Sequence, residues 1–130
     1  MKTLLTTIAI LLFTGITFGQ IEFDKIYSSA MDDGATQYIR IYEDGLVLMV
    51  ATKDDISQVK EYFTKESEGK TGVVLYKSQS KIKEGSKASF VLENDGNKIN
   101  CIAQGNGATL SLTMLSPSMG KQEKEFKLVE

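Results

Sequence analysis

The chain has 130 residues, 42% of them hydrophobic, and its 15 Lys and Arg against 17 Asp and Glu give a formal net charge of −2. This slightly acidic balance argues against nonspecific binding to nucleic acid, which needs a basic surface. The sequence has no histidine, which excludes a Ser-His-Asp triad, a Cys-His pair and any histidine-ligated zinc or iron site within this chain.

Residues 1–19 have the pattern of a cleavable export signal. A basic start at Met1-Lys2 precedes an almost wholly apolar run, and Gly19 supplies a small residue at the cleavage position. An uncleaved membrane anchor is the alternative, but the apolar run is shorter than the roughly 20 residues that span a bilayer. We expect cleavage after Gly19, which leaves residues 20–130 as a single exported domain, periplasmic or extracellular, with no membrane span.

The only cysteine, Cys101, cannot form a disulfide within the chain. The fold must therefore be held by its hydrophobic core and by a hydrogen-bonded sheet. Because Cys101 lies in an alternating, strand-like run, we expect a buried and unreactive thiol.

The first part of the domain is predicted to contain three strands joined by two short acidic turns. Each turn ends in glycine, at Asp32-Asp33-Gly34 and at Glu43-Asp44-Gly45. Asp-Gly between alternating runs is a strong hairpin signal, because both central positions of a type I′ turn, or the bulge position of a three-residue loop, need a positive φ. The three strands are expected at residues 23–31, 37–42 and 46–52.

An amphipathic helix is expected next, at residues 54–65. Asp54 and Asp55 lie where an N-cap and a favourable first-turn charge belong. Apolar residues recur at helical spacing, at Ile56, Val59, Tyr62 and Phe63. We expect this stripe to pack on the sheet or plug it, and the alternative is a helix that binds a membrane surface or a partner.

Period-two alternation returns after Gly72 and predicts five more strands, with short turns between them. They are expected at residues 73–77 (or to 82 through a bulge), 87–93, 98–104, 108–115 and 122–130. In the last strand Phe126 and Leu128 share one face. Glu123, Glu125 and Lys127 face away, which would protect an exposed edge if the sheet does not close.

Eight short antiparallel strands with one short helix predict an all-β meander, closed as an up-and-down barrel because closure removes unpaired edges. A two-sheet β-sandwich is the alternative. With its Tyr38–Gly45 hairpin, the helix around Val59–Phe63 and the meander that follows, the chain resembles small exported lipocalin-like (calycin-type) β-barrel proteins. The resemblance implies a barrel whose interior holds a small apolar ligand. The chain departs from the typical lipocalin pattern in two ways. It lacks tryptophan, and its helix lies between the third and fourth strands, whereas the lipocalin helix follows the last strand.

Acidic pairs and a glycine-rich turn are the only other motifs with catalytic or metal-binding potential. Asp32-Asp33, Glu43-Asp44 and Asp54-Asp55 could supply the two acids of a glycoside hydrolase. Each pair lies in a turn or at a helix start, however, where acids have backbone roles, and none matches an EF-hand loop. Gly105-Asn106-Gly107 is too short for a phosphate loop. We therefore expect no catalytic residues, no metal site and no cofactor.

The candidate ligand-binding residues are the stripe Tyr38, Arg40 and Tyr42, joined by Tyr76. Two tyrosines around Arg40, the chain's single arginine, could hold an anionic or planar ligand by stacking and charged hydrogen bonds. The alternative is an outward sheet face on which the tyrosines cover apolar surface and Arg40 meets a neighbouring acid.

Three functional hypotheses follow from the sequence. The first is a noncatalytic module that binds a small hydrophobic or amphipathic ligand. The second is a protein-interaction or inhibitor domain of the cell envelope. The third, an enzyme that uses only carboxylates, is the least favoured because its acids are accounted for by turns.

Overall fold

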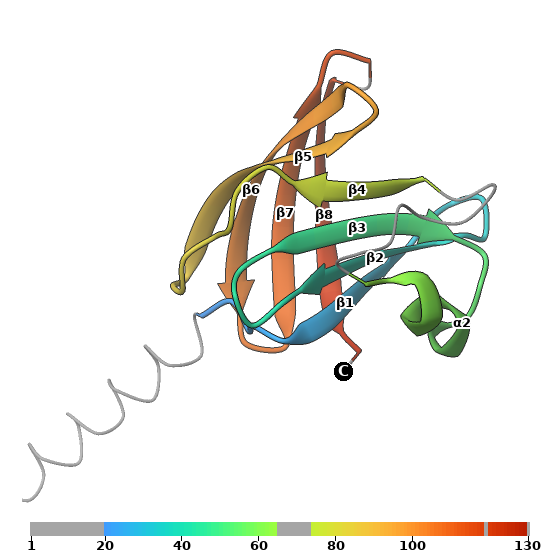
Figure 1. The fold of residues 1–130 in the computed structure, drawn as a ribbon, viewed down its shortest axis with the longest axis horizontal. Helices are drawn as coiled ribbons and strands as arrows, with labels where there is room; N and C mark the ends of the chain where they lie inside the picture. Colours follow the sequence, from blue (N-terminus) through green and yellow to red (C-terminus); the bar gives the residue numbers. More distant parts are fainter. Residues whose placement is uncertain (1–19, 65–73, 119, 130) are drawn as a thin grey trace, which may run out of the picture.

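The computed structural model describes residues 20–64, 74–118 and 120–129 (Figure 1). The predicted export signal, the end of the predicted helix at residue 65 and the start of the predicted fourth strand at residue 73 lie outside these ranges.

The described residues form a closed barrel of eight antiparallel strands in which each strand pairs with its neighbours in sequence and β1 pairs with β8. This confirms the predicted up-and-down barrel over the β-sandwich. The strands are β1 (Lys25–Ala30), β2 (Thr36–Ile41), β3 (Val47–Thr52), β4 (Leu75–Ser78), β5 (Lys87–Asn94), β6 (Asn97–Asn106), β7 (Thr109–Ser116) and β8 (Gly120–Leu128).

The two acidic turns lie at opposite ends of β2 and have the same construction. Each ends in a glycine with positive φ, 86° at Gly34 and 93° at Gly45. In each, the middle aspartate accepts a hydrogen bond from the backbone N–H two residues on, at 3.0 Å for Asp33 and 3.1 Å for Asp44. Backbone hydrogen bonds close both as three-residue loops, so of the two predicted geometries the chain adopts the one with glycine at the bulge position.

One apolar cluster, the inner core, fills the middle of the barrel. Alternate residues of the strands point inward, as the pleat of a strand requires, and the largest of them have no accessible surface. The fully buried members are Tyr27, Ile39, Val47, Leu92, Leu110 and Phe126. A water-filled lumen at this level would leave its lining side chains accessible, so this part of the barrel is packed rather than hollow.

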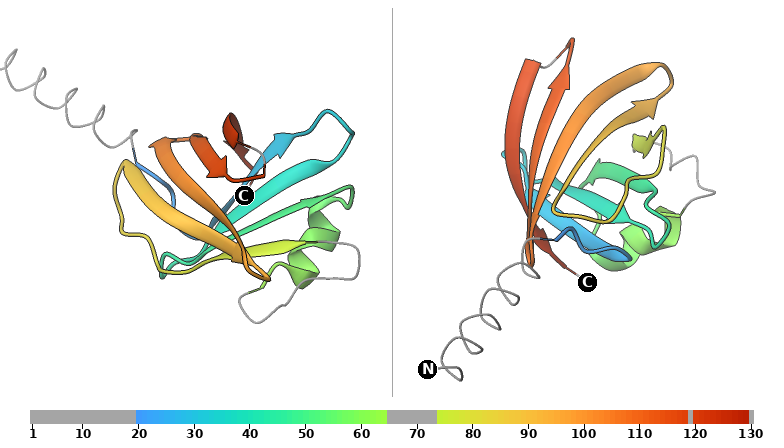
Figure 2. Two further views of the ribbon diagram at one scale, coloured as in Figure 1. Left: turned by 90° about the horizontal axis from the view of Figure 1, so that it is seen from above. Right: turned by 90° about the vertical axis from the view of Figure 1, so that its left-hand side faces the viewer.

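The short helix α2 (Ile56–Tyr62) covers the outer face of β1 to β4 (Figures 1 and 2). Asp55 accepts a hydrogen bond from the backbone N–H of Gln58, and the Gln58 side chain accepts one from the backbone N–H of Asp55. This capping box starts the helix at Ile56. Val59 and Phe63 pack with strand residues in a second cluster, the outer core. The predicted packing of the helix on the sheet is confirmed, and it lies outside the barrel rather than plugging it.

None of the described helices has the length and hydrophobicity to cross a membrane.

One end of the barrel is closed by backbone contacts. The N–H of Ile21 donates to Gly85 O at 2.9 Å, and the N–H of Gly105 donates to Ser86 O at 2.8 Å. A Cβ atom on Gly105 would lie only 2.5 Å from the nitrogen of Ile21, so this position needs glycine for the chain to pass. Residues 20–24 and the β4–β5 loop therefore close this end of the barrel, which we call the closed end.

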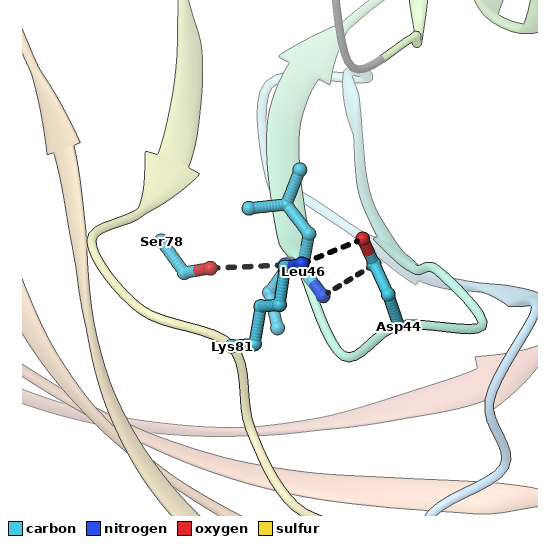
Figure 3. Close-up of polar contacts among 5 residues, drawn as sticks. Asp44, Leu46, Ser78 and Lys81 are labelled. Atoms are coloured by element: carbon cyan, nitrogen blue, oxygen red, sulfur yellow. Dashed lines mark hydrogen bonds and ion pairs between the residues drawn. The ribbon is translucent and has the colours of Figure 1, made fainter.

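Side-chain contacts join the β2–β3 turn to β4 and the β4–β5 loop at the closed end (Figure 3). Ser78 Oγ accepts a hydrogen bond from the N–H of Val47 at 3.0 Å. Asp44 accepts a hydrogen bond from the N–H of Leu46 within its own turn, and it forms an ion pair with Lys81 Nζ at 3.3 Å. Asp44 is therefore a structural residue of the turn.

Cys101 points into the inner core from β6 and is 2% exposed, which confirms its predicted burial. Burial raises the pKa of its thiol from an ordinary 9.0 to about 12.

Because the thiolate is the reactive species, we expect Ellman's reagent at pH 8 to label the Cys101 thiol of the folded protein at least about 100-fold more slowly than that of the urea-unfolded protein. The variant Cys101→Ala should give no signal in either state. Equal rates in the two states would show that the thiol is accessible.

Candidate functional site

The predicted ligand stripe does not assemble as one site. Tyr38, Arg40 and Tyr42 lie on the outer face, where Tyr38 and Tyr42 join the outer core, whereas Tyr76 packs against the inner core from β4. The structure brings the first three together and leaves Tyr76 on the opposite side of the barrel wall.

Arg40 and Tyr42 hold the end of α2 on the sheet. The Nη1 atom of Arg40 and the hydroxyl of Tyr42 both donate to the carbonyl oxygen of Phe63, at 2.9 Å and 2.8 Å. The guanidinium lies 4.6 Å from the centre of the Tyr42 ring, within the range of a cation–π contact. Phe63 is the C-cap residue of α2, and the last carbonyls of a helix have no partner within it. Two donors of the stripe are thus engaged in the fold.

Tyr38 is 6% exposed and covers apolar surface beneath the helix, as the structural alternative for this stripe expects. The same alternative expects Arg40 to meet a neighbouring acid. In the structure, Arg40 donates instead to the carbonyl oxygen of Phe63. Arg40 also borders a shallow depression, of about 340 Å³, with Asp24, Ile26 and Lys60.

The acidic pairs also have backbone roles. Asp33, Asp44 and Asp55 each accept a hydrogen bond from a backbone N–H. The hydroxyl of Ser57 and the N–H of Gln58 lower the pKa of Asp55, which is the opposite of what a general acid needs. Within the described ranges, no three Cys, Asp or Glu side chains gather as a potential metal site.

The other end of the barrel, which we call the open end, carries the β1–β2, β5–β6 and β7–β8 turns. Two depressions lie there. The β8 depression, about 380 Å³, is lined by Ala30, Met31, Asp32, Asp33, Gln37, Gln122 and Lys124. The hairpin depression, about 650 Å³, is lined by Tyr76, Gly96, Asn97, Lys98, Ile99, Asn100, Ser116, Pro117 and Ser118.

A polar pair borders the inner core at the open end. Gln37 points inward from β2 and is 8% exposed. Its Nε2 atom donates to the sulfur of Met49 at 3.2 Å, and its Oε1 atom accepts from Lys124 Nζ at 3.1 Å. Lys124, half-buried on β8, lies opposite the fully enclosed Leu112 of β7. A cation and an amide therefore directly border the thioether and aliphatic side chains of the inner core.

Charges of both signs line the β8 depression. Lys124 contributes the cation, and Asp32 and Asp33 contribute carboxylates from the β1–β2 turn. Asp33 already accepts a hydrogen bond within its turn. Lys124 keeps donors in addition to the one that it gives to Gln37, because an ammonium group has three.

Comparison with protein families, with characterised proteins and with solved structures gives no match. The function must be argued from the geometry of the barrel itself.

Gln37 and Lys124 are functional candidates that the sequence analysis did not single out. The alternation contained a signal for Lys124 alone, which is in phase with Phe126 on a strand whose other face is charged. A lysine at an inward position, two residues from a core phenylalanine, is unusual enough to be noticed. Its amide partner could not have been identified in this way, since the two residues lie 87 positions apart.

Proposed function

We propose that residues 20–130 form an exported, noncatalytic module that binds a small amphipathic ligand at the open end of the barrel. The observation that carries the proposal is the hydrogen-bonded pair of Gln37 and Lys124 bordering the inner core. A ligand with a polar head and an apolar body can there place the head against the ammonium group. Its body can lie against Ala30 and Met31, the apolar residues that line the β8 depression together with Lys124.

The packing of the inner core determines where such a ligand lies. Tyr27, Leu110 and Phe126 have no accessible surface, so a ligand is held at the open end and not in the middle of the barrel. The amphipathic ligand is that of the first functional hypothesis from the sequence, but it lies at the open end and not in the barrel interior that the lipocalin-like resemblance implies. Small-ligand sites commonly combine an apolar lining with a few polar groups that fix orientation, and this end of the barrel offers both.

Native mass spectrometry of the protein purified from its host tests the proposal. We expect a discrete added mass that disappears on denaturation. Calorimetric titration with laurate, an anionic amphiphile, should give saturable binding. A bare mass together with no laurate binding would contradict the proposal.

Two matched variants then locate the site. Lys124→Gln removes the inward cation and should weaken laurate binding about tenfold, the value of a hydrogen bond to a charged group. Lys127→Gln removes an exposed outward cation from the same strand and should leave the affinity within about twofold. Equal effects of the two variants would place the ligand elsewhere.

A further inference from the structure

The barrel is closed only weakly between β1 and β8. These strands pair at Tyr27–Leu128 and Ser28–Lys127, and the N–H of Val129 donates to Ile26 O at 2.8 Å. Beyond Ser28 the strands diverge: the β7–β8 hairpin rises to the top of Figure 1, whereas the β1–β2 hairpin extends to the right (see also Figure 2). Within the described residues, the part of β8 before Lys127 pairs with a strand on one side only, with β7.

The hydrogen-bonding groups of this free edge follow from the register. The N–H of Leu128 donates to Ala108 O, so Leu128 is hydrogen-bonded to β7. In an antiparallel pair this bonding alternates along the strand, and the backbone groups of Gln122 and Lys124 therefore also point to β7. The backbone groups of Lys121, Glu123 and Glu125 point away from β7, into the gap that separates this part of β8 from β1.

The side chains on the free edge restrict what can pair with it. Lys121, Glu123 and Glu125 are exposed, and Lys121 Nζ lies 3.5 Å from the Glu123 carboxylate in an exposed ion pair. Charges on an edge strand prevent indiscriminate strand pairing. Directly opposite like charges in a sheet are destabilising, and opposite charges are stabilising. A strand with basic residues opposite Glu123 and Glu125 therefore fits this edge, whereas an acidic one does not. The inward side chains of such a strand would face the β8 depression.

We propose that the edge of β8 at Glu123 and Glu125 binds an extended peptide segment of a partner protein by strand addition, and that this segment carries basic side chains opposite the two glutamates. Main-chain hydrogen bonds to an unpaired edge give such a complex its affinity, and alternate side chains give it specificity. This function goes beyond the binding of a small ligand. It also gives a specific form to the protein-interaction hypothesis from the sequence.

A charge swap tests the side-chain part of the proposal. The probes are two synthetic peptides, one of alternating lysine and valine and one of alternating glutamate and valine, measured by fluorescence anisotropy at low salt. The unmodified protein should prefer the lysine peptide at least about tenfold. The double variant Glu123→Lys/Glu125→Lys should reverse this preference. No preference in the unmodified protein, or no reversal in the variant, would overturn the proposal.

A pair of proline variants tests the backbone part. Proline is tolerated on an edge strand where its missing N–H faces solvent. Glu123→Pro should therefore remain folded by circular dichroism and lose peptide binding at least about tenfold. Glu123→Gln, which keeps the N–H and removes the charge, should retain more of the binding. Gln122→Pro removes an N–H that points to β7 and should unfold at a clearly lower urea concentration. Peptide binding by Glu123→Pro equal to that of Glu123→Gln would overturn the proposal, as would equal stability of the two proline variants.

Both tests leave Gln37 and Lys124 unchanged, so failure of the peptide proposal would not affect the small-ligand proposal.

Discussion

Phe126→Ala is expected to lower the free energy of unfolding by about 3–5 kcal/mol. Phe126 lies in the inner core with no accessible surface and faces Leu110 across β7 and β8. Removing its ring loses the transfer free energy of a large apolar side chain and leaves a cavity. Leu110 comes from β7, which pairs with β6 on one side and with β8 on the other, so the wall on this side can move in only slightly. Urea denaturation should show a lower midpoint with an unchanged slope.

Two further variants make this measurement interpretable. Lys127→Ala changes the next residue, whose side chain is exposed, and should alter stability by no more than about 0.5 kcal/mol. Phe126→Leu retains most of the apolar volume and should lose much less stability than Phe126→Ala, which keeps the test open if the alanine variant does not fold. A loss below about 1 kcal/mol for Phe126→Ala would mean that the middle of the barrel is not packed around this ring.

The strands and turns could be predicted because their signals are local. On β6, the inward residues Ile99, Cys101 and Ala103 alternate with exposed polar neighbours along most of the strand. The turn before it contains Asp95 and Gly96, and both have a positive φ, as a type I′ turn requires. Each of these features depends on a few consecutive residues, and together they fix the number and order of the strands.

The faces of β2 and β3 could not be predicted in the same way. In β3, Val47, Leu48, Met49 and Val50 are all buried, alternately in the inner and the outer core. Alternation assigns a core face only when the other face is in water. Here α2 covers the outer face, so the sequence alone could not show that Tyr38 and Tyr76 lie on opposite sides of the wall.

The candidate site also depends on contacts between distant parts of the chain. Lys124 meets Gln37 because β8 closes the barrel next to β1 and β2, and the end of α2 meets Arg40 because the helix folds back over β2. Local pattern can show that a lysine points inward. It cannot show which polar group from another strand will meet it.

Gly45→Ala is expected to destabilise the protein more than Gly34→Ala, although the two glycines occupy the same position in turns of the same construction. Both have a positive φ, so an alanine at either site costs about 1–2 kcal/mol of backbone strain. At Gly34 a Cβ atom meets nothing within 4 Å, whereas at Gly45 it would lie 2.2 Å from the carbonyl oxygen of Ile82. The β4–β5 loop must move away, although it is held there by a 2.9 Å hydrogen bond from the N–H of Ile82 to Gly45 O.

The difference between the two glycine variants isolates the cost of this close approach. Losing the hydrogen bond and part of the burial of Ile82 should add about 2 kcal/mol to the strain that both variants share. Urea denaturation measures the total for each variant. Amide hydrogen exchange then locates the change, because the N–H of Ile82 should exchange faster in Gly45→Ala and at the unmodified rate in Gly34→Ala. Equal losses of stability with an unchanged Ile82 amide would mean that the β4–β5 loop does not rest on the β2–β3 turn in solution.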